Sequence, residues 1–270
     1  MALAGAWGGP RPVAFEVGLD LADRYVLRSA LGAGGSGVVF RAWDTDLACA
    51  VAVKIFDEAG EGRPASVTRL RREVCLARSV SHPNVCPVFD LARWRGYWFM
   101  TMELAVGTLR DEIDASSADA ATEPDWPRRL RDARAMCAGL AAVHEANITH
   151  ADVTPRNVLR MGDGRLALAD FGLARRDGDD VTANGGTLSY LPPEVMMGGL
   201  PDRRSDLWQL GIVLHEILLG HRPRWQMSCS RPVAELPCAS LPPEVRRALD
   251  FAAWCLAWDP LARPARATGF

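Results

Sequence analysis

Residues 148–159 read Ile-Thr-His-Ala-Asp-Val-Thr-Pro-Arg-Asn-Val-Leu, and residues 167–172 read Ala-Leu-Ala-Asp-Phe-Gly. In these two runs an acid, Asp152, is followed five residues later by an amide, Asn157, and a second acid, Asp170, begins a short turn. One carboxylate can accept the proton of a hydroxyl group, while the amide and the other carboxylate can hold two magnesium ions against ATP. The stretch therefore predicts a nucleotide-dependent phosphoryl-transfer centre.

The composition is that of a globular protein. With 270 residues, 49% of them hydrophobic and 24% charged, the chain is long enough for one large domain or two lobes. The 31 basic and 33 acidic residues give a net charge of -2, so we expect no nucleic-acid partner and no anionic membrane surface as a partner.

Targeting and redox signals point to the inside of a cell. The seven cysteines are an odd number without a Cys-x-x-Cys pair, which favours reduced thiols over a disulfide framework or a zinc ribbon. Residues 1–9 lack the basic start of a signal peptide, and the longest apolar run, 207–219, is too short to span a membrane. The expected location is cytoplasmic or intracellular, with a host cell nucleus as the alternative for a viral protein.

The N-terminal part predicts a flexible leader over 1–22, followed by strands on either side of a glycine-rich turn. Residues 31–42 read Leu-Gly-Ala-Gly-Gly-Ser-Gly-Val-Val-Phe-Arg-Ala. Dinucleotide-binding folds use the same glycine spacing between a strand and a helix, but the β-branched and aromatic residues 38–40 indicate that a strand leaves this turn. Such a hairpin brings backbone amides close to phosphate oxygens.

Two charged residues stand on apolar faces. Lys54 interrupts the buried strand 51–55, and Glu73 shares the inward face of a helix expected from Pro64 to about Val80. A buried charge is costly unless it meets an opposite charge. We therefore predict that Lys54 and Glu73 form an ion pair.

The segment 87–102 predicts two strands around a turn at 93–96. Glu103, Leu104 and Ala105 would then form a hinge whose backbone could bond an adenine edge, with Met102 at the back of that pocket. Beyond residue 127, apolar residues recur at helical spacing up to Asn147.

Taken together, these motifs resemble the catalytic domain of the eukaryotic-type protein kinase superfamily, from about Tyr25 onward. They stand in the order of that family: the glycines at 32–37, Lys54, Glu73, His150-x-Asp152 with Asn157, Asp170-Phe171-Gly172, Gly186-Thr187, Pro193-Glu194, Asp206-x-Trp208 and Arg263. The resemblance implies an α+β, bilobal fold. Its N-lobe, 23–103, would hold a five-stranded antiparallel sheet and one helix, and its C-lobe, 104–270, would be mainly α-helical.

The resemblance also implies the roles of the site residues, with ATP and Mg²⁺ as cofactors. Asp152 would be the catalytic base, Lys54 would place phosphates, and Asn157 and Asp170 would bind the metal. The expected ATP-binding residues are Leu31, Gly32, Ala33, Gly34, Gly35, Ser36, Gly37, Val39, Ala52, Lys54, Glu73, Met102, Glu103 and Ala105.

Four further roles are structural under the same resemblance. His150 would pack against Phe171 and brace the loop. Asp206 would tie down the catalytic-loop backbone, and Glu194 and Arg263 would form a buried ion pair.

The loop departs from the family at two positions. Ala151 replaces a common arginine, which removes the receptor for a phosphorylated activation segment, so we expect activity without phosphorylation at Thr182, Thr187 or Ser189. Thr154 replaces the lysine of serine/threonine kinases, and Arg156 is predicted to supply part of the missing charge as a catalytic residue. The hydroxyl group of Thr187 is expected to be structural and to form a hydrogen bond towards Asp152.

The predicted function is a protein serine/threonine kinase that acts on a hydroxyl group of a protein substrate. The residues around Thr187 and Glu194 resemble serine/threonine rather than tyrosine kinases. Two alternatives stay open: an ATP-binding pseudokinase scaffold, because of Thr154, and a small-molecule phosphotransferase, which shares the His-x-Asp-x-x-Pro-x-Asn loop. The glycine-rich segment is similar to bacterial kinases and the loop to herpesvirus-type kinases. A regulatory protein partner is also considered, and the sequence carries no signal for an oligomeric state.

Overall fold

The computed structural model describes residues 15–34, 37–56, 64–118, 124–176, 186–223, 225–228, 231–234, 241–268 and 270. The chain forms two compact units. The first comprises Met1–Arg78 and Pro87–Ala105, and the second comprises Ser79–Cys86 and Val106–Phe270.

The segment Ser79–Cys86 belongs to the second unit and not to the N-lobe in which the sequence placed it. The reason is a set of backbone and side-chain contacts with residues 166–168. The Cys86 amide donates to the Leu168 carbonyl at 2.8 Å, and Asn84 Nδ2 donates to the Leu166 carbonyl at 2.7 Å.

The first unit is built on an antiparallel sheet with the strand order β1-β2-β3-β4-β6-β5. Along β3, buried side chains alternate with more exposed ones, the expected pattern for a strand that packs one face on a core. The strands are β1 (Asp20–Leu21), β2 (Tyr25–Gly34), β3 (Gly37–Asp44), β4 (Cys49–Ile55), β5 (Val88–Trp94) and β6 (Tyr97–Glu103).

The sheet has one strand more than the five that were expected. The additional strand, β1, pairs with β2 through Asp20 and Leu21. Leu21 is fully buried, and Phe15 packs edge-on against Tyr97 with ring centroids 4.9 Å apart. Residues 15–22 are therefore part of the first unit and not of a flexible leader, because their apolar side chains close one end of its core. Residues 1–14 lie outside the described part of the chain.

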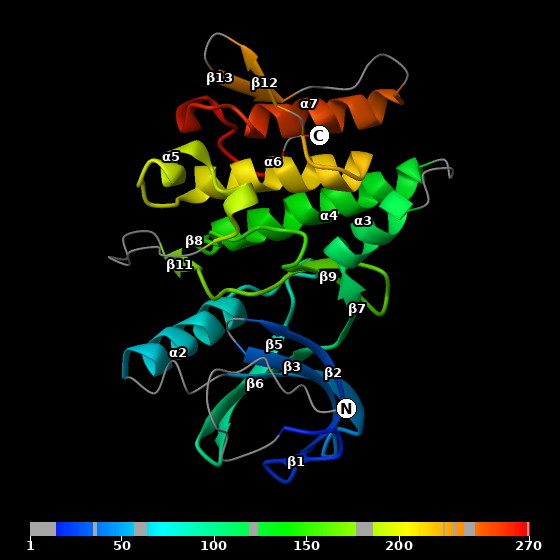
Figure 1. The fold of residues 1–270 in the computed structure, drawn as a ribbon, viewed down its shortest axis with the longest axis vertical. Helices are drawn as coiled ribbons and strands as arrows, with labels where there is room; N and C mark the ends of the chain where they lie inside the picture. Colours follow the sequence, from blue (N-terminus) through cyan, green and yellow to red (C-terminus); the bar gives the residue numbers. More distant parts are fainter. Residues whose placement is uncertain are drawn as a thin grey trace. The chain divides into compact units, whose positions relative to one another are not determined.

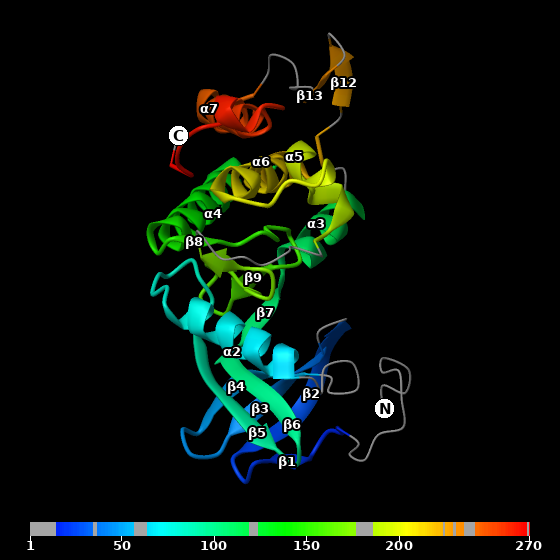
Figure 2. The ribbon, with the colours of Figure 1, turned by 90° about the vertical axis from the view of Figure 1, so that its left-hand side faces the viewer.

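One helix, α2 (Pro64–Arg78), lies against this sheet beside β5 (Figure 2). Leu70, Val74 and Ala77 are buried on its inward face, as the helical spacing predicts. The β5–β6 hairpin turns through Arg95 and Gly96, which both have positive φ, as a two-residue hairpin turn requires.

The second unit is organised around α6 (Arg203–Leu219), a helix buried on nearly every side. Both of its ends carry caps. Asp202 caps the first turn in a capping box with Ser205, and Gly220 ends the helix in the left-handed conformation that glycine tolerates best.

Two further helices lie on either side of α6 and run nearly alongside it: α4 (Trp126–Glu145) and α7 (Pro243–Cys255) (Figure 1). The contact between α6 and α7 depends on Gly211. A Cβ atom at this position would lie 2.9 Å from the Ala252 carbonyl oxygen and 3.0 Å from Cys255 Cβ, so only glycine allows this approach.

The remaining elements of the second unit are short. They are β7 (Ala105–Thr108), which begins in the first unit, α3 (Leu109–Ala118), β8 (Ile148–Thr149), β9 (Val158–Met161), β10 (Leu166–Leu168), β11 (Arg175–Arg176), η1 (Leu188–Tyr190), α5 (Pro193–Met196), β12 (Trp225–Ser228), β13 (Arg231–Ala234) and η2 (Pro260–Ala262). β9 pairs with β10 and β7, and β8 pairs with β11. These small sheets hold both ends of the loop 150–157 between β8 and β9, which is the predicted catalytic loop.

β9 is fixed to two helices by a buried arginine. Arg160 donates two hydrogen bonds to Glu112 on α3, at 2.8 and 2.9 Å, and two to Asp132 on α4, at 2.8 and 2.7 Å. Two carboxylates around one buried guanidinium compensate its desolvation, so the end of the catalytic loop is firmly placed.

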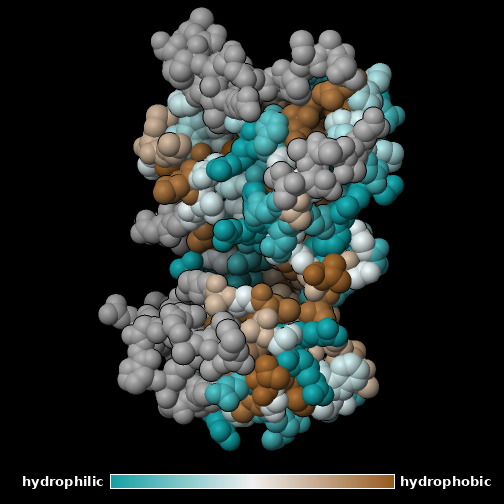
Figure 3. All heavy atoms as spheres, turned by 45° about the vertical axis from the view of Figure 1, so that its right-hand side comes forward, coloured by the Kyte–Doolittle hydropathy of each residue, from teal (hydrophilic) through white to brown (hydrophobic). Residues whose placement is uncertain are grey.

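On the face seen in Figure 3, separate apolar patches lie among hydrophilic side chains of the residues that the structure describes. Across the described ranges, none of the helices is long and apolar enough to cross a membrane.

Candidate active site

The predicted ion pair of the first unit is confirmed. Lys54 Nζ lies 3.2 Å from Glu73 Oε1, and the two side chains are 7% and 9% exposed. Lys54 is the only lysine among the 31 basic residues of the chain, the other 30 being arginine. Arginine cannot lose its charge or act as a compact point charge, so a lysine retained at this one position is consistent with a role as a phosphate-binding ammonium group.

The glycine-rich turn joins β2 to β3, and Gly34 pairs with Gly37 at its base. Gly37 has a φ of +140°, and a Cβ atom there would lie within 2.1 Å of the Ile55 carbonyl oxygen. Leu31, Gly32 and Ala33 are exposed. Gly35 and Ser36 lie outside the described residues, so their predicted role stays a prediction.

The other predicted ATP-binding residues of this unit lie on neighbouring strands. Val39 on β3 is the register partner of Lys54 on β4, and Ala52 on β4 is the partner of Met102 on β6. Glu103 ends β6, where its amide donates to the Pro87 carbonyl at 3.1 Å, and Ala105 begins β7.

In the second unit, two side chains of α6 hold the backbone on both sides of Asp152. Asp206 accepts hydrogen bonds from the amides of His150, at 2.8 Å, and Ala151, at 2.7 Å, as expected. Gln209 accepts from the Val153 amide at 2.8 Å and donates to the Ala151 carbonyl at 3.2 Å. Both side chains are fully buried, so the position of Asp152 is determined by the central helix.

The Asp152 carboxylate faces Asn157 and Thr187. Asn157 Nδ2 donates to the backbone oxygen and to Oδ2 of Asp152, both at 2.8 Å. The Thr187 amide and hydroxyl lie 3.3 and 3.4 Å from Asp152 Oδ1, which makes the expected Thr187 contact a long one. Because Nδ2 of Asn157 is used for Asp152, its Oδ1 is the atom that can coordinate a cation.

Asp170 follows β10 on a neighbouring loop. The Ala169 amide donates to the Asn157 carbonyl at 2.8 Å, so the two predicted metal-binding residues lie on loops that are bonded to each other. Asp170 has a φ of +64°, and its Oδ1 accepts from the Gly172 amide at 3.2 Å. A residue held in this unfavourable conformation is typical of a functional turn.

The His150 side chain contacts the loop that carries Asp170. Its ring packs against Phe171 with centroids 5.0 Å apart, as expected, and its Nε2 lies 3.1 Å from the Ala169 carbonyl oxygen. Burial lowers the pKa of His150, and the nearby carboxylates only partly oppose this effect. Burial in this place therefore favours the neutral form of the His150 ring.

The donor set fits a magnesium ion. Carboxylate and amide oxygens are the protein ligands that Mg²⁺ prefers, and it usually takes only one or two protein groups together with phosphate oxygens. In the part of the chain that the structure describes, no group of three histidine, cysteine or acidic side chains forms a closed metal cage.

The positions that depart from the family pattern have different surroundings. Arg156 is exposed, whereas Thr154 is buried with 2% of its surface accessible. Ala151 has a φ of +65° and lines a small pocket with room for about one water molecule, together with Leu173, Leu191, Pro192, Val195, Pro201, Ser205 and Gln209. A neutral, buried Thr154 cannot supply the charge of a lysine, and the role of Arg156 stays a prediction.

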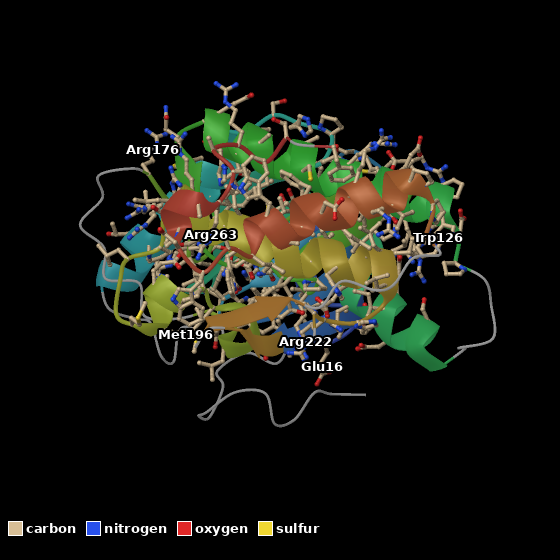
Figure 4. The ribbon with its side chains drawn as sticks, turned by 90° about the horizontal axis from the view of Figure 1, so that it is seen from above. Glu16, Trp126, Arg176, Met196, Arg222 and Arg263 are labelled. Atoms are coloured by element: carbon tan, nitrogen blue, oxygen red, sulfur yellow. The ribbon has the colours of Figure 1, made fainter. Side chains whose placement is uncertain are left out.

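The predicted ion pair behind the segment 186–194 is confirmed. Arg263 donates from Nη1 and Nη2 to the two oxygens of Glu194, each at 2.7 Å, and Arg263 has no exposed side-chain surface. Ser205 on α6 donates to the same carboxylate at 2.8 Å. Figure 4 shows Arg263 beside α6 and α7, where it fixes α5 (Pro193–Met196).

Two residues of the site were not foreseen. They are Gln209 and His144, and neither was assigned a role from the sequence. His144 is buried, and its Nε2 lies 2.8 Å from Asp206. The spacing of Gln209, three residues after Asp206, places both side chains on one face of α6 and is the signal that could have found it.

Comparison with known proteins agrees with this arrangement. A family model described as "Protein kinase domain" matches residues 25–268. PknL, a serine/threonine-protein kinase of Mycobacterium tuberculosis, is 34% identical over 209 residues, which cover 75% of this chain and 51% of that protein.

In two other bacterial relatives, the similar region makes up a smaller part of the protein than in PknL. PrkC, a serine/threonine-protein kinase of Bacillus subtilis, is 33% identical over 215 residues, or 77% of this chain and 32% of that protein. PknB of Mycolicibacterium smegmatis, also a serine/threonine-protein kinase, is 35% identical over 75% of this chain and 33% of that protein. The chain thus spans about half or less of the length of these relatives. Because the family model covers residues 25–268 of the 270 residues, the chain belongs to the protein kinase family.

Proposed function

We propose that this protein transfers the γ-phosphoryl group of ATP to a serine or threonine hydroxyl of a protein substrate. Protein kinases use ATP and a divalent metal ion in general, and we propose Mg²⁺ as the metal for this chain. The observation that carries the proposal is the placement of Asp152. Its backbone is held by Asp206 and Gln209, while its carboxylate faces Asn157 and Thr187.

In this proposal, Asp152 orients the substrate hydroxyl and accepts its proton as the phosphoryl group is transferred. Asn157 Oδ1 and the Asp170 carboxylate would hold the metal, which supplies neutralisation of phosphate charge. The ammonium group of Lys54, oriented by Glu73, would bind phosphate oxygens. The protein then contributes mainly positioning and charge stabilisation.

Serine or threonine specificity is supported by the names of the three relatives and by the segment 186–194. The Thr187 amide and hydroxyl lie beside Asp152, and Glu194 is held by Arg263 behind them. This segment would carry the substrate chain past Asp152.

The experiment is phosphoryl transfer from labelled ATP to a generic basic protein. We expect Asp152→Asn to lower turnover by at least about 1,000-fold, because the proton acceptor and part of the transition-state positioning are lost. Asp250→Asn, a matched change on the exposed side of α7, should keep wild-type turnover. Equal incorporation by the wild type and Asp152→Asn would disprove the assignment.

A second candidate function is an ATP-binding scaffold without turnover. The observation that favours it is the buried, uncharged Thr154 at the position where serine/threonine kinases carry a lysine. ATP-dependent thermal stabilisation without label transfer would support the scaffold. A loss of at least tenfold in turnover in Arg156→Ala, with unchanged ATP affinity, would instead show that Arg156 supplies the missing charge.

A further inference from the structure

Arg110, in the first turn of α3, contacts three segments that are distant from it in the sequence. Its backbone amide donates to the Pro155 carbonyl in the catalytic loop at 3.1 Å. Its guanidinium Nη2 donates to the Tyr190 hydroxyl at 2.7 Å and to Glu216 Oε1 at 2.5 Å. One residue thus joins the catalytic loop, the turn η1 and the central helix α6 of the second unit.

The three side chains form a closed hydrogen-bond cluster. The Tyr190 hydroxyl accepts from Arg110 and donates to Glu216 Oε2 at 2.7 Å. The Glu216 side chain is 1% exposed and that of Arg110 is 21% exposed. Burial and the adjacent Glu216 carboxylate raise the pKa of Tyr190, so its hydroxyl keeps its proton and remains a donor.

This cluster is bonded to two residues near Asp152, Thr187 and Pro155. The Tyr190 amide donates to the Thr187 carbonyl at 2.8 Å, and the amide and hydroxyl of Thr187 lie near Asp152 Oδ1. Pro155, which accepts the Arg110 amide, stands between Asp152 and Asn157. Arg110 therefore holds both segments between which a substrate hydroxyl must be placed.

We propose that Arg110 is a positioning residue: it fixes the segment Thr187–Tyr190 against the catalytic loop, so that a substrate hydroxyl is presented to Asp152. The inference rests on the proposed kinase function. A neutral side chain at position 110 would leave Glu216 buried without a counter-charge and would remove the donor to the Tyr190 hydroxyl, which would keep only its bond to Glu216. The segment would then be held less firmly.

Arg110→Met tests this proposal. We expect at least a tenfold loss of turnover with labelled ATP and a protein substrate, while the KM for ATP changes less than twofold. Arg110→Lys, which keeps the charge but ends in a shorter side chain with a single nitrogen, should recover part of the turnover. Asp114→Asn removes only the exposed contact of Arg110, Nη1 to Asp114 at 3.2 Å, and should behave as the wild type.

A double variant separates positioning from stability. In Arg110→Met/Glu216→Gln the buried charge is gone, so the melting temperature should return towards that of the wild type while turnover stays low. If turnover recovers together with the melting temperature, Arg110 is only a structural residue and the proposal fails.

Amide hydrogen exchange tests the anchor without catalysis. We expect exchange at the Tyr190 and Leu191 amides, which donate within the turn, to become at least tenfold faster in Arg110→Met, with the amides of α6 unchanged. Unchanged exchange at these two amides would overturn the anchor even in an active kinase. Faster exchange in a protein whose wild type transfers no phosphate would support the anchor and count against the proposed function.

Discussion

At the scale of single residues, the site relies on charges that are buried in pairs. Burial raises the pKa of Glu194, but the hydrogen bonds from Arg263 outweigh this effect and leave the pKa below its ordinary value. A carboxylate whose pKa is lowered in the folded state stabilises the protein fully above the ordinary pKa of 4.5. The stabilisation is lost as the pH falls through the lowered value.

Arg263→Met should lower the free energy of unfolding by about 3–5 kcal/mol at pH 7, because Glu194 is left half-buried without its counter-charge. The loss should shrink below pH 4.5, where the carboxyl group begins to be protonated in the unfolded chain. Urea unfolding at pH 7 and pH 4 measures both effects. Arg263→Met/Glu194→Met should regain part of the stability, and a double variant as unstable as the sum of the single variants would contradict the pairing.

Site residues could be predicted from the sequence where a charged residue stands on an otherwise apolar face. Lys54 and Glu73 stood on apolar faces, so their pairing followed from the cost of burying a charge. Gln209 and Arg110 carry no such mark, because a glutamine in a helix and an arginine in a first turn are ordinary. Their roles depend on how α6 and α3 pack against the catalytic loop. Residue spacing along the chain does not predict these contacts between distant segments.

At the scale of elements, the long periodic segments were predicted correctly and the short ones were not. α2, α4 and the β5–β6 hairpin have repeating apolar faces, caps or turn residues. β1 has only two residues, too few for any period, and its place in the sheet depends on the burial of Leu21 and Phe15. The same limit explains why residues 15–22 resembled a leader.

The packing of α7 on α6 provides an element-scale prediction. Gly211→Ala should lower the free energy of unfolding by about 1–3 kcal/mol, because the new Cβ atom would lie 2.9 Å from both the Ala252 carbonyl oxygen and Leu256 Cγ. Gly162→Ala is the matched control, since its Cβ atom would meet nothing within 4 Å. Chemical denaturation measures both variants, and an equal effect on stability would show that α7 does not approach α6 as closely as described.

At the scale of the whole molecule, the predicted chemistry is divided between the two units. Lys54 and Glu73 belong to the first unit, while Asp152, Asn157 and Asp170 belong to the second. The order of motifs along the chain was enough to predict two lobes, but not that Ser79–Cys86 joins the second one. That segment is held by hydrogen bonds to residues more than 80 positions away, which no local pattern reveals.

Nucleotide binding by the whole chain can be measured through its stability. A ligand that binds only the folded protein adds about 2.7 kcal/mol at 100 times its Kd, so ATP with Mg²⁺ should raise the melting temperature of the wild type by several degrees. Lys54→Met should lose most of this increase, because the chain has no second lysine that could supply an ammonium group. Arg41→Met, which removes an exposed charge from β3, is the control and should keep the full increase. The quantity to compare is the increase caused by ATP and not the melting temperature itself, since Lys54→Met also removes the buried ion pair with Glu73. An equal increase in the wild type and Lys54→Met would show that Lys54 does not bind the phosphates.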